Sequence, residues 1–500
     1  MLNQQEKLIL SPYLALYDQL IPKDHFLRLL NEQVDFSFVE SELRDHYCLN
    51  NGRNATPPIQ MFKYLLLKSI SSLSDVNLVE RCRYDLSYKY FLGLAPEDNV
   101  IHPSSLTKFR KLRLKDENLL DLLIEKSVQF ALQKGVLKSK TIYMDATHIS
   151  SRYRFYSKGD LLLERARKLR HQVYSTDSQM KDKFPPRPKT HEIEDTIAYC
   201  NRIVEIVREQ KWLSQIPAVN EPMNYLEEGI EDVTELQTSY DEEARIGYKK
   251  KREFFHGYKL HMAMADERII TAAVLTSGNE IDAPKLKELV DKSKRFGMKV
   301  SRVVGDSAYG TGVNLRYCMG NENESEESPN REAIELIAPL RGNETHETHA
   351  KTGFEYNKDA GMYQCPGGHL SITKKRNKSR VNQKGYKISA TETYYFDTEK
   401  CKTCRQKEGC YNEKSKTRSY SVSIKDQVHK EQAEKQKSKE FRELYQKRYK
   451  IEAKNNEIKN VYQCASTQSA GLFALEIQSA TAIFISNIKR IMKLEKEKAR

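Results

Sequence analysis

Two short apolar runs, each ending in an aspartate, constrain the fold of this 500-residue chain more than any other feature. KTIYMD ends at Asp145, and MKVSRVVGD ends at Asp306. Between them, FFHGYKLHMAMADERIITAAVLTS is typical of two strands around an Asp-Glu turn, and IDAPKLKELVDKSKRFG is typical of a helix. Strand, hairpin, helix and strand in this order predict an α/β fold with a mixed sheet and a crossover connection. Both aspartates are then expected at the rim of that sheet.

Helical patterns lie on both sides of the first strand. Residues 57–130 hold three short helical segments: PPIQMFKYLLLKSI opens with proline, while SLSDVNLVERCRYD and HPSSLTKFRKLRL are each expected to begin after a serine cap. The last segment is basic, which suits DNA binding, although small helical bundles without DNA partners are also common. After Asp145, apolar residues spaced three and four apart predict a helical insertion. In one of its helices these residues are Ile193, Ile197, Cys200, Val204 and Val207.

The charge balance favours a polyanionic partner. The chain has 83 Lys and Arg against 69 Asp and Glu, a net charge of +14 and a pI near 9.1, which does not choose among DNA, RNA and anionic lipid. Acids and a proline interrupt the N-terminal apolar residues, so we expect no signal peptide and a cytoplasmic protein. The one long apolar tract, residues 471–488, contains Glu476 and Gln478. A buried helix therefore fits it better than a membrane span.

A polar stripe marks the segment YQKRYKIEAKNNEIK, which is expected to form one helix. The stripe consists of Tyr445, Arg448, Glu452 and Lys459. At about 100° per residue, these positions fall within an arc of roughly 60°. An adjacent apolar seam of Leu444, Ile451 and Ile458 would bury the helix and hold the stripe at its edge.

If this helix packs across the rim of the sheet, Asp145, Asp306 and Glu452 converge from three distant parts of the chain. Taken singly, each aspartate is more often a turn or helix cap, and the stripe is more often a solvated face with ion pairs. Converging carboxylates repel one another unless a cation neutralises them. Oxygen ligands without His or Cys suit Mg²⁺ or Mn²⁺, and two such ions support phosphoryl transfer.

The other stripe residues then suit DNA. Arg448 can fork onto a phosphate, Lys459 supplies a point charge along the backbone, and Tyr445 offers a hydroxyl and a stacking face. Three histidines flank the motifs, but two-metal chemistry requires no histidine base, so we leave them outside the catalytic set. They are His148, His256 and His261.

These motifs together resemble the DDE transposases of bacterial insertion sequences, in the branch marked by Tyr, two residues, Arg, three residues, Glu, six residues, Lys. Tyr445, Arg448, Glu452 and Lys459 reproduce that spacing. YMDATHIS, VVGDSAYG and the block DEEARIGYKKKREFFHGYKLHMAMAD are similar to the motifs around the two aspartates, and the helical segments before residue 115 are similar to the N-terminal domain of that group. One departure is Ala146 after the first aspartate, where many relatives have glycine.

The resemblance implies a ribonuclease H-like mixed sheet flanked by helices. We expect an N-terminal helical DNA-binding domain over 1–135 and a catalytic domain over 136–340 and 426–500. The catalytic domain is expected to carry a helical insertion at about 155–250 and a small Cys-containing insertion at 341–425. The resemblance also implies Mg²⁺ or Mn²⁺, double-stranded DNA with terminal inverted repeats, a target DNA, and a homodimer or higher assembly at the bacterial nucleoid, with no membrane attachment.

Two other functions stay open. A nuclease of the same fold would need the same carboxylates but would not join strands. A catalytically silent DNA-binding protein descended from such an enzyme would need none of them, and the presence of all three acids and the full stripe argues against it.

The sequence CKTCRQKEGC clusters three of the nine cysteines within ten residues. A structural zinc site would use Cys365, Cys401, Cys404 and Cys410, and it would stabilise a segment that is poor in apolar residues. The alternative is a set of reduced surface thiols.

Overall fold

The computed structural model covers the whole chain, and most residues are placed well enough to describe. The described residues are 11–48, 54–115, 117–188, 192–233, 239–250, 253–320, 332–340, 353–357, 359–378, 380–381, 387–388, 390–408, 410–412, 415–423 and 427–499. The polar segment 321–330, expected to be a loop, lies outside them.

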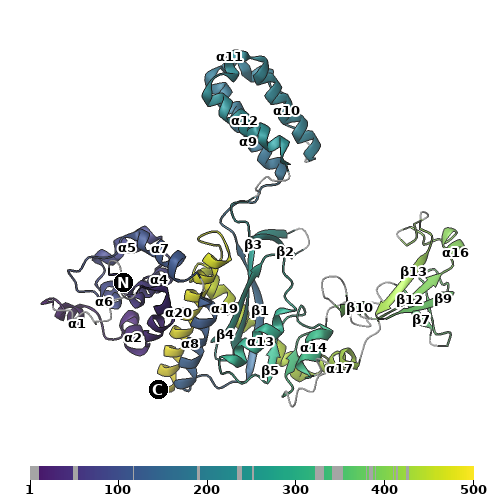
Figure 1. Ribbon diagram of the computed structural model, residues 1–500. Helices are drawn as coiled ribbons and strands as arrows, with labels where there is room; N and C mark the ends of the chain where they lie inside the picture. The colour runs from purple at the N-terminus through teal and green to yellow at the C-terminus, as the bar shows by residue number, and fades with distance from the viewer. Residues whose placement is uncertain are drawn as a thin grey trace.

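A six-stranded mixed sheet forms the centre of the molecule (Figure 1). Its strands are β1 (Thr141–Ser150), β2 (Arg245–Lys250), β3 (Glu253–Ala265), β4 (Ile270–Ser277), β5 (Arg302–Val304) and β6 (Glu335–Ile337). The order is β2-β3-β1-β5-β6, and β4 pairs with the second half of β3. β1 is antiparallel to β3 and parallel to β5, and β5 is parallel to β6. The expected strand, hairpin, helix and strand are confirmed, with α13 (Lys285–Arg295) as the crossover helix.

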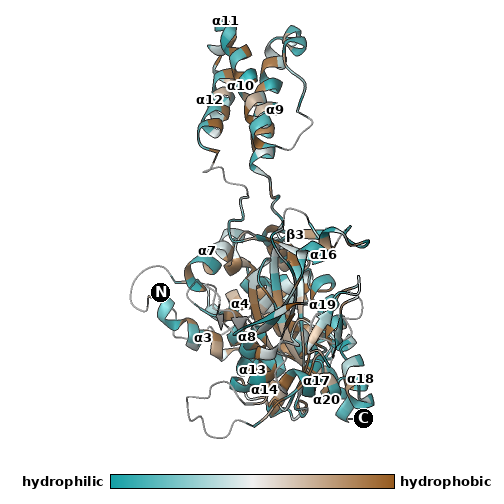
Figure 2. Cartoon of the chain, turned by 90° about the vertical axis from the view of Figure 1, so that its right-hand side faces the viewer, coloured by the Kyte–Doolittle hydropathy of each residue, from teal (hydrophilic) through white to brown (hydrophobic). Residues whose placement is uncertain are grey.

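Helices cover the sheet because its strands carry apolar side chains on both faces. α8 (Leu119–Gln133) and α20 (Leu472–Ala499) pack together and both contact β4, while α19 (Tyr449–Asn460) contacts β1. Figure 2 shows the hydrophobic residues gathered in this central body. The apolar tract at 471–488 is the buried part of α20, as expected. Among the described residues, none of the helices has the length and apolar character needed to cross a bilayer.

In the described part of the chain, seven α-helices precede α8. They are α1 (Ala15–Leu20), α2 (Phe26–Gln33), α3 (Ser37–Leu43), α4 (Pro58–Ser71), α5 (Asp75–Tyr84), α6 (Leu86–Leu92) and α7 (Pro103–Arg113). The proline start of α4 and the Ser74 cap of α5 are confirmed. The serine cap expected for α7 was wrong, because the His102 ring accepts the hydrogen bond from the backbone N–H of Ser104. These helices share one apolar core with the sheet, and α4 packs directly on α20.

The helical insertion forms an arm with its own core, standing apart from the sheet in Figure 1. It contains α9 (Lys158–Thr176), α10 (Ile193–Glu209), α11 (Lys211–Ser214) and α12 (Pro217–Glu231). The apolar periodicity expected in α10 is confirmed: Cys200, Val204 and Val207 are buried, and Ile193 and Ile197 pack against them. Because this core is separate, none of the arm's described side chains belongs to the apolar interior of the central body.

A second insertion holds a small three-stranded sheet in the order β13-β12-β9. Its strands are β9 (Thr373–Asn377), β12 (Thr391–Phe396) and β13 (Arg418–Ser423), next to the hairpin of β7 (Glu355–Asn357) and β8 (Met362–Gln364) and the short helix α16 (Thr398–Lys402). The two-residue strands β10 (Arg380–Val381) and β11 (Lys387–Ile388) pair with each other. After it, α17 (Gln427–Lys435) and α18 (Lys439–Gln446) return the chain to the sheet, and α17 packs on α14 (Gly312–Cys318).

Candidate active site

Asp145 and Asp306 each follow the paired residues of two neighbouring parallel strands, β1 and β5. The register pairs Tyr143 of β1 with Val304 of β5, and each aspartate follows its paired residue by two positions. β1 does not end at Asp145, as the sequence suggested, but continues to Ser150 because its other edge pairs with β3 as far as Gly257. Asp145 therefore lies within β1, whereas β5 ends at Val304 and Asp306 lies just beyond it.

Asp306 also serves its own turn. Its Oδ1 accepts a hydrogen bond from the backbone N–H of Ala308 at 2.9 Å. This is the turn-capping role that aspartates often have at strand ends. A carboxylate has a second oxygen and further lone pairs, so the turn does not use up the capacity of Asp306 as a ligand.

The polar stripe does not lie on one continuous helix. α18 ends at Gln446 and α19 begins at Tyr449. At the junction, the backbone N–H groups of Arg448 and Lys450 each bond the carbonyl three residues earlier, at 3.0 and 3.1 Å. Bonds of this kind are typical of a 3-10 helix, which has three residues per turn rather than 3.6. The angular positions predicted for the stripe residues around one helix axis therefore do not hold across the junction. The prediction of a single helix was wrong, whereas the apolar seam is confirmed: Ile451 and Ile458 are fully buried, and Leu444 packs against the same core.

Arg448 connects two of the three carboxylates. Its Nη1 lies 3.4 Å from Oδ1 of Asp145, and its Nη2 donates a hydrogen bond to Oε1 of Glu452. Side-chain exposure rises from 18 % for Asp145 and 21 % for Arg448 to 52 % for Glu452. The site thus runs from a nearly buried aspartate to an open glutamate, with the guanidinium between them.

The electrostatics of Asp145 show how crowded this site is. Burial raises the pKa of Asp145 to about 6, and the Arg448 guanidinium opposes that rise. The carboxylates of Asp306 and Glu452 raise the pKa further, while the backbone N–H of Ala146 lowers it. Asp306 and Glu452 therefore both lie within electrostatic range of Asp145, and their negative charges favour a cation among the three groups.

Asn455 is a site residue that the sequence reasoning missed. Its Nδ2 donates a hydrogen bond to Oδ2 of Asp145 at 2.8 Å, and its Oδ1 is buried with no hydrogen-bond partner in the described structure. Asn455 follows Glu452 by three residues, so the two share a helical face. That spacing places Asn455 on the same face as Glu452, but it does not reveal the contact with Asp145, which depends on how α19 packs against β1.

The start of α19 is fixed by a second contact to the sheet. Lys450 Nζ lies 2.6 Å from Oδ1 of Asp266, and the Tyr143 hydroxyl donates to the same oxygen at 2.8 Å. Tyr143 is on β1, two residues before Asp145, and Lys450 is two residues before Glu452. This contact therefore fixes α19, which carries Glu452, relative to β1, which carries Asp145.

The remaining stripe residues lie at the edges of the site. Tyr445 on α18 stacks on Phe441, with ring centroids 6.3 Å apart, and the Arg448 guanidinium lies 6.0 Å from its ring centroid. Burial lowers the pKa of Lys459, and the nearby Lys249 lowers it further, whereas Asp145 raises it. Lys459 is therefore close enough to act on Asp145, and Tyr445 touches the site through Arg448.

Two of the flanking histidines, half-buried His148 and fully buried His261, lie in surroundings that disfavour a protonated ring. Burial lowers the pKa of His148 to about 4, helped by Lys259 and Lys459, and its ring lies edge-on to Phe255 at 4.5 Å. Burial likewise lowers the pKa of His261 to about 4, and its Nε2 shares a hydrogen bond with the Thr276 hydroxyl at 3.0 Å. Both rings are therefore neutral at pH 7.

The oxygen donors of the site suit a hard cation, but the carboxylates are not close enough together to bind one in this conformation. Across the described part of the chain, no three His, Cys, Asp or Glu side chains are close enough together to hold a metal ion. Between Asp145 and Glu452 the positive charge is supplied by Arg448. Oxygen donors from three carboxylates, with the orphaned Oδ1 of Asn455 beside them, fit Mg²⁺ or Mn²⁺ by type.

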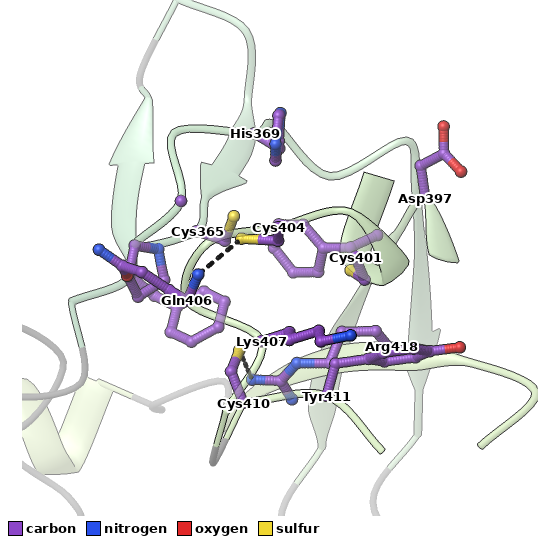
Figure 3. A pocket seen from close by; sticks show the side chains of 14 residues that line it. Cys365, His369, Asp397, Cys401, Cys404, Gln406, Lys407, Cys410, Tyr411 and Arg418 are labelled. Atoms are coloured by element: carbon purple, nitrogen blue, oxygen red, sulfur yellow. Dashed lines mark hydrogen bonds between the residues drawn. The ribbon is translucent and has the colours of Figure 1, made fainter. Parts of the chain in front are cut away.

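The four cysteines proposed from the sequence meet in a different place. Cys365 follows β8, Cys401 lies in α16, and Cys404 and Cys410 lie in the turns after it. All four line one cavity of about 50 Å³ (Figure 3). All four are free cysteines. In the described structure, no three of their sulfur atoms are close enough together to hold a metal ion.

Two family models match the chain. Residues 15–112 match the family described as Transposase domain (DUF772), and residues 227–488 match the family described as Transposase DDE domain. The comparison with curated proteins and the comparison with solved structures each gave no match. The second family match covers more than half of the chain and includes β3, β5 and α19. The chain therefore belongs to the transposase DDE domain family, which confirms the resemblance to the insertion-sequence DDE transposases and the ribonuclease H-like α/β fold.

Proposed function

We propose that this protein is a DNA transposase that cuts and joins the ends of an insertion sequence by metal-dependent phosphoryl transfer. The observation that carries the proposal is the single guanidinium of Arg448, which joins Asp145 of the sheet to Glu452 of α19. Asp306 follows the adjacent strand β5 and lies within electrostatic range of Asp145. Two of the three carboxylates contact this positive charge, and Asp306 lies within its electrostatic range.

Asp145, Asp306 and Glu452 would hold the metal, which we propose to be two Mg²⁺ or Mn²⁺ ions. Two such ions supply activation of the attacking oxygen and stabilisation of the leaving oxygen in an in-line displacement. The contribution of the chain is to bring the carboxylates together. β1 and β5 fix the two aspartates relative to each other, and the contact of Lys450 with Asp266 fixes the helix that carries Glu452.

Arg448 has two roles in this proposal. Without metal it neutralises Asp145 and Glu452. With these carboxylates engaged in holding metal, the guanidinium would be available to fork onto a DNA phosphate, for which its planar geometry is suited. We assign Lys459 and Tyr445 to the same DNA strand, Lys459 as a phosphate contact and Tyr445 as a stacking surface beside Arg448.

The N-terminal helices are proposed to bind the same DNA. On the basic helix α7, Arg110 pairs with Asp75, and Arg113 donates to the carbonyl of His46. Both arginines therefore serve the helical domain itself. Lys108 and Lys111 on the same helix are exposed, so we assign the phosphate contacts to them.

The larger organisation follows from the same proposal. We propose terminal inverted repeats and target DNA as partners, a homodimer or higher assembly, and action at the bacterial nucleoid. We keep 1–135 as the DNA-binding domain, 136–340 and 426–500 as the catalytic domain, and 155–250 and 341–425 as its insertions. The separate cores of the arm and of the Cys-containing insertion support treating those two as units.

A cleavage assay tests this function and separates it from the alternatives. The purified full-length protein is incubated with DNA that carries the inverted repeats found beside its gene, with Mg²⁺, with Mn²⁺ or with a chelator. We expect cut ends and joined products with either ion and none with the chelator. Cut ends without joined products would identify a nuclease, and binding without cutting under all conditions would identify a silent DNA-binding protein.

A further inference from the structure

The Cys-containing insertion has very little apolar core. Among its described residues, the buried cluster consists of Phe354, Tyr363, Tyr394 and Phe396. Strand β9 is exposed along its whole length. Segments of this size rarely fold on so small a core, and natural ones usually add a disulfide or a metal ion. No disulfide is formed by its cysteines, which are all free.

Four thiols from two segments, Cys365 after β8 and three cysteines within residues 401–410, line one cavity beside this core. The side chains of Cys365, Cys401, Cys404 and Cys410 all line it, and Figure 3 shows them in one view. Cys401 lies within electrostatic range of the other three thiols. The cavity also borders on Phe354 and Phe396, so a group bound there would extend the small apolar core.

The backbone around the cavity is shaped for sulfur. A Cβ added to Gly367 would lie 2.9 Å from Cys404 Sγ and 3.7 Å from Cys365 Sγ. The turn that contains it is closed by a hydrogen bond from the N–H of Gly368 to the carbonyl of Cys365 at 2.8 Å. Any other residue at 367 would push against a sulfur, so the glycine permits the turn to approach both thiols.

Two donors already point at the sulfurs. The backbone N–H of Gln406 donates to Cys404 Sγ at 3.4 Å, and Arg418 Nη2 donates to Cys410 Sγ at 3.4 Å. N–H groups of this kind support thiolate ligands in metal sites. Lys407 also lines the cavity, so two positive side chains lie beside a site where four thiolates around one divalent ion would carry a net charge of −2.

We propose that Cys365, Cys401, Cys404 and Cys410 bind one structural zinc ion that joins β8, α16 and the turns after it. Zn–S bonds are about 2.3 Å long. No three of the described sulfur atoms are now close enough together to hold a metal ion, so zinc binding requires the four sulfur atoms to move closer to one another. Each side chain has one rotatable bond to its sulfur. Binding releases the four thiol protons to solvent, and with four protein ligands the ion keeps no open position for catalysis.

The test is the zinc content of the purified full-length protein, measured by elemental analysis. We expect about one zinc per chain, lost in Cys404→Ser and in Cys410→Ser. Cys48→Ser serves as the matched control, since Cys48 is an exposed cysteine outside the cavity, and it should keep the metal. His369→Ala removes a cavity residue that is not a proposed ligand, and it should also keep the metal. Loss of zinc in His369→Ala but not in Cys410→Ser would overturn the proposed ligand set.

A second measurement covers variants that fold poorly. Wild-type protein stripped of metal and reloaded with Co²⁺ should show the absorption of cobalt bound by thiolates, and titration should end at about one ion per chain. Wild-type protein that neither contains zinc nor takes up Co²⁺ in this way would overturn the proposal. Both readouts are independent of DNA cleavage, so they stand whether or not the protein is a transposase.

Discussion

Asn455 Nδ2 lies 2.8 Å from Oδ2 of Asp145, while Arg448 Nη1 faces the other carboxylate oxygen at 3.4 Å. Arg448 immediately precedes α19, and Asn455 lies two turns further along the chain. The two side chains therefore contact the two different oxygens of the Asp145 carboxylate. The orientation of the Asp145 carboxylate is therefore set by the helix that carries Glu452.

We expect Asn455→Ala to lower the rate of DNA cleavage about 10-fold to 100-fold, because a hydrogen bond to a charged group contributes about 1.5 to 3 kcal/mol. The loss should be partly recovered at high Mg²⁺, since the substitution disturbs the orientation of a ligand and does not remove one. The measurement is the cleavage rate as a function of Mg²⁺ concentration. Asn456→Ala is the matched control, because Asn456 is the exposed neighbour on the same helix. If the cleavage rate of Asn455→Ala depends on Mg²⁺ concentration in the same way as that of the control, Asn455 contributes only to packing.

We expect Glu452→Gln to reduce cleavage by more than about 100-fold, which exceeds the 10-fold to 100-fold effects of residues that only support metal ligands. DNA binding should persist, because the substitution preserves the shape of the side chain and removes a negative charge. Cleavage and gel-shift assays on the same DNA measure the two properties. Glu443→Gln provides a control on α18, where the glutamate is exposed and pairs only loosely with Lys439 at 3.7 Å. Full cleavage by Glu452→Gln would remove Glu452 from the proposed metal site.

The sequence predicted the parts of this site that depend on regular geometry. Asp145 and Asp306 lie within electrostatic range of each other because the strands that precede them pair in parallel. Ile451 and Ile458 are buried on the apolar seam that helical periodicity predicts. Where the backbone departs from regular geometry, the prediction failed. The tight turn at Arg448 breaks the stripe between α18 and α19.

Two further features could not be read from the residue pattern. The hydrogen bond from Asn455 to Asp145 depends on how a helix docks on a sheet, which residue spacing on the helix does not determine. The cap of α7 was also misjudged. His102 takes the place expected for serine, because its ring nitrogen can accept a backbone hydrogen bond as an oxygen does.

We expect Arg448→Ala to weaken binding to the cleaved DNA ends and to reduce the slope of log affinity against log salt by about 1, as for the loss of one phosphate contact. The substitution also removes the positive charge between Asp145 and Glu452. Affinities measured at several salt concentrations in the presence of Mg²⁺ test this. Lys439→Ala is a suitable control, since Lys439 is a highly exposed cation on the neighbouring helix. If Arg448→Ala binds with the slope of the wild type, the arginine serves only as an internal ion pair.

Lys63 on α4 gives a prediction about stability and pH. Burial lowers its pKa from 10.5 to about 8. Its Nζ donates to Asn31 Oδ1 at 2.6 Å and lies 5.2 Å from the ring centroids of Phe36 and Phe91. Below pH 8 the lysine is charged in both the folded and the unfolded chain, so the folded state bears the full cost of burying the charge. Between pH 8 and 10.5 the folded protein loses the proton first, and that cost disappears.

Lys63→Met should therefore raise the free energy of unfolding by about 1–2 kcal/mol at pH 7, which is less than the pKa shift alone would give, because the contacts with Asn31 and the two rings are lost. This advantage over the wild type should shrink as the pH rises from 8 towards 10.5. Denaturant unfolding of both proteins at several pH values measures the difference between their free energies of unfolding. The titration of all other groups contributes equally to the two proteins and cancels in this difference. Lys23→Met, at an exposed lysine, should show no such pH-dependent difference. A stabilisation by Lys63→Met that stays constant across this pH range would show that Lys63 is not the group whose charge is costly to bury.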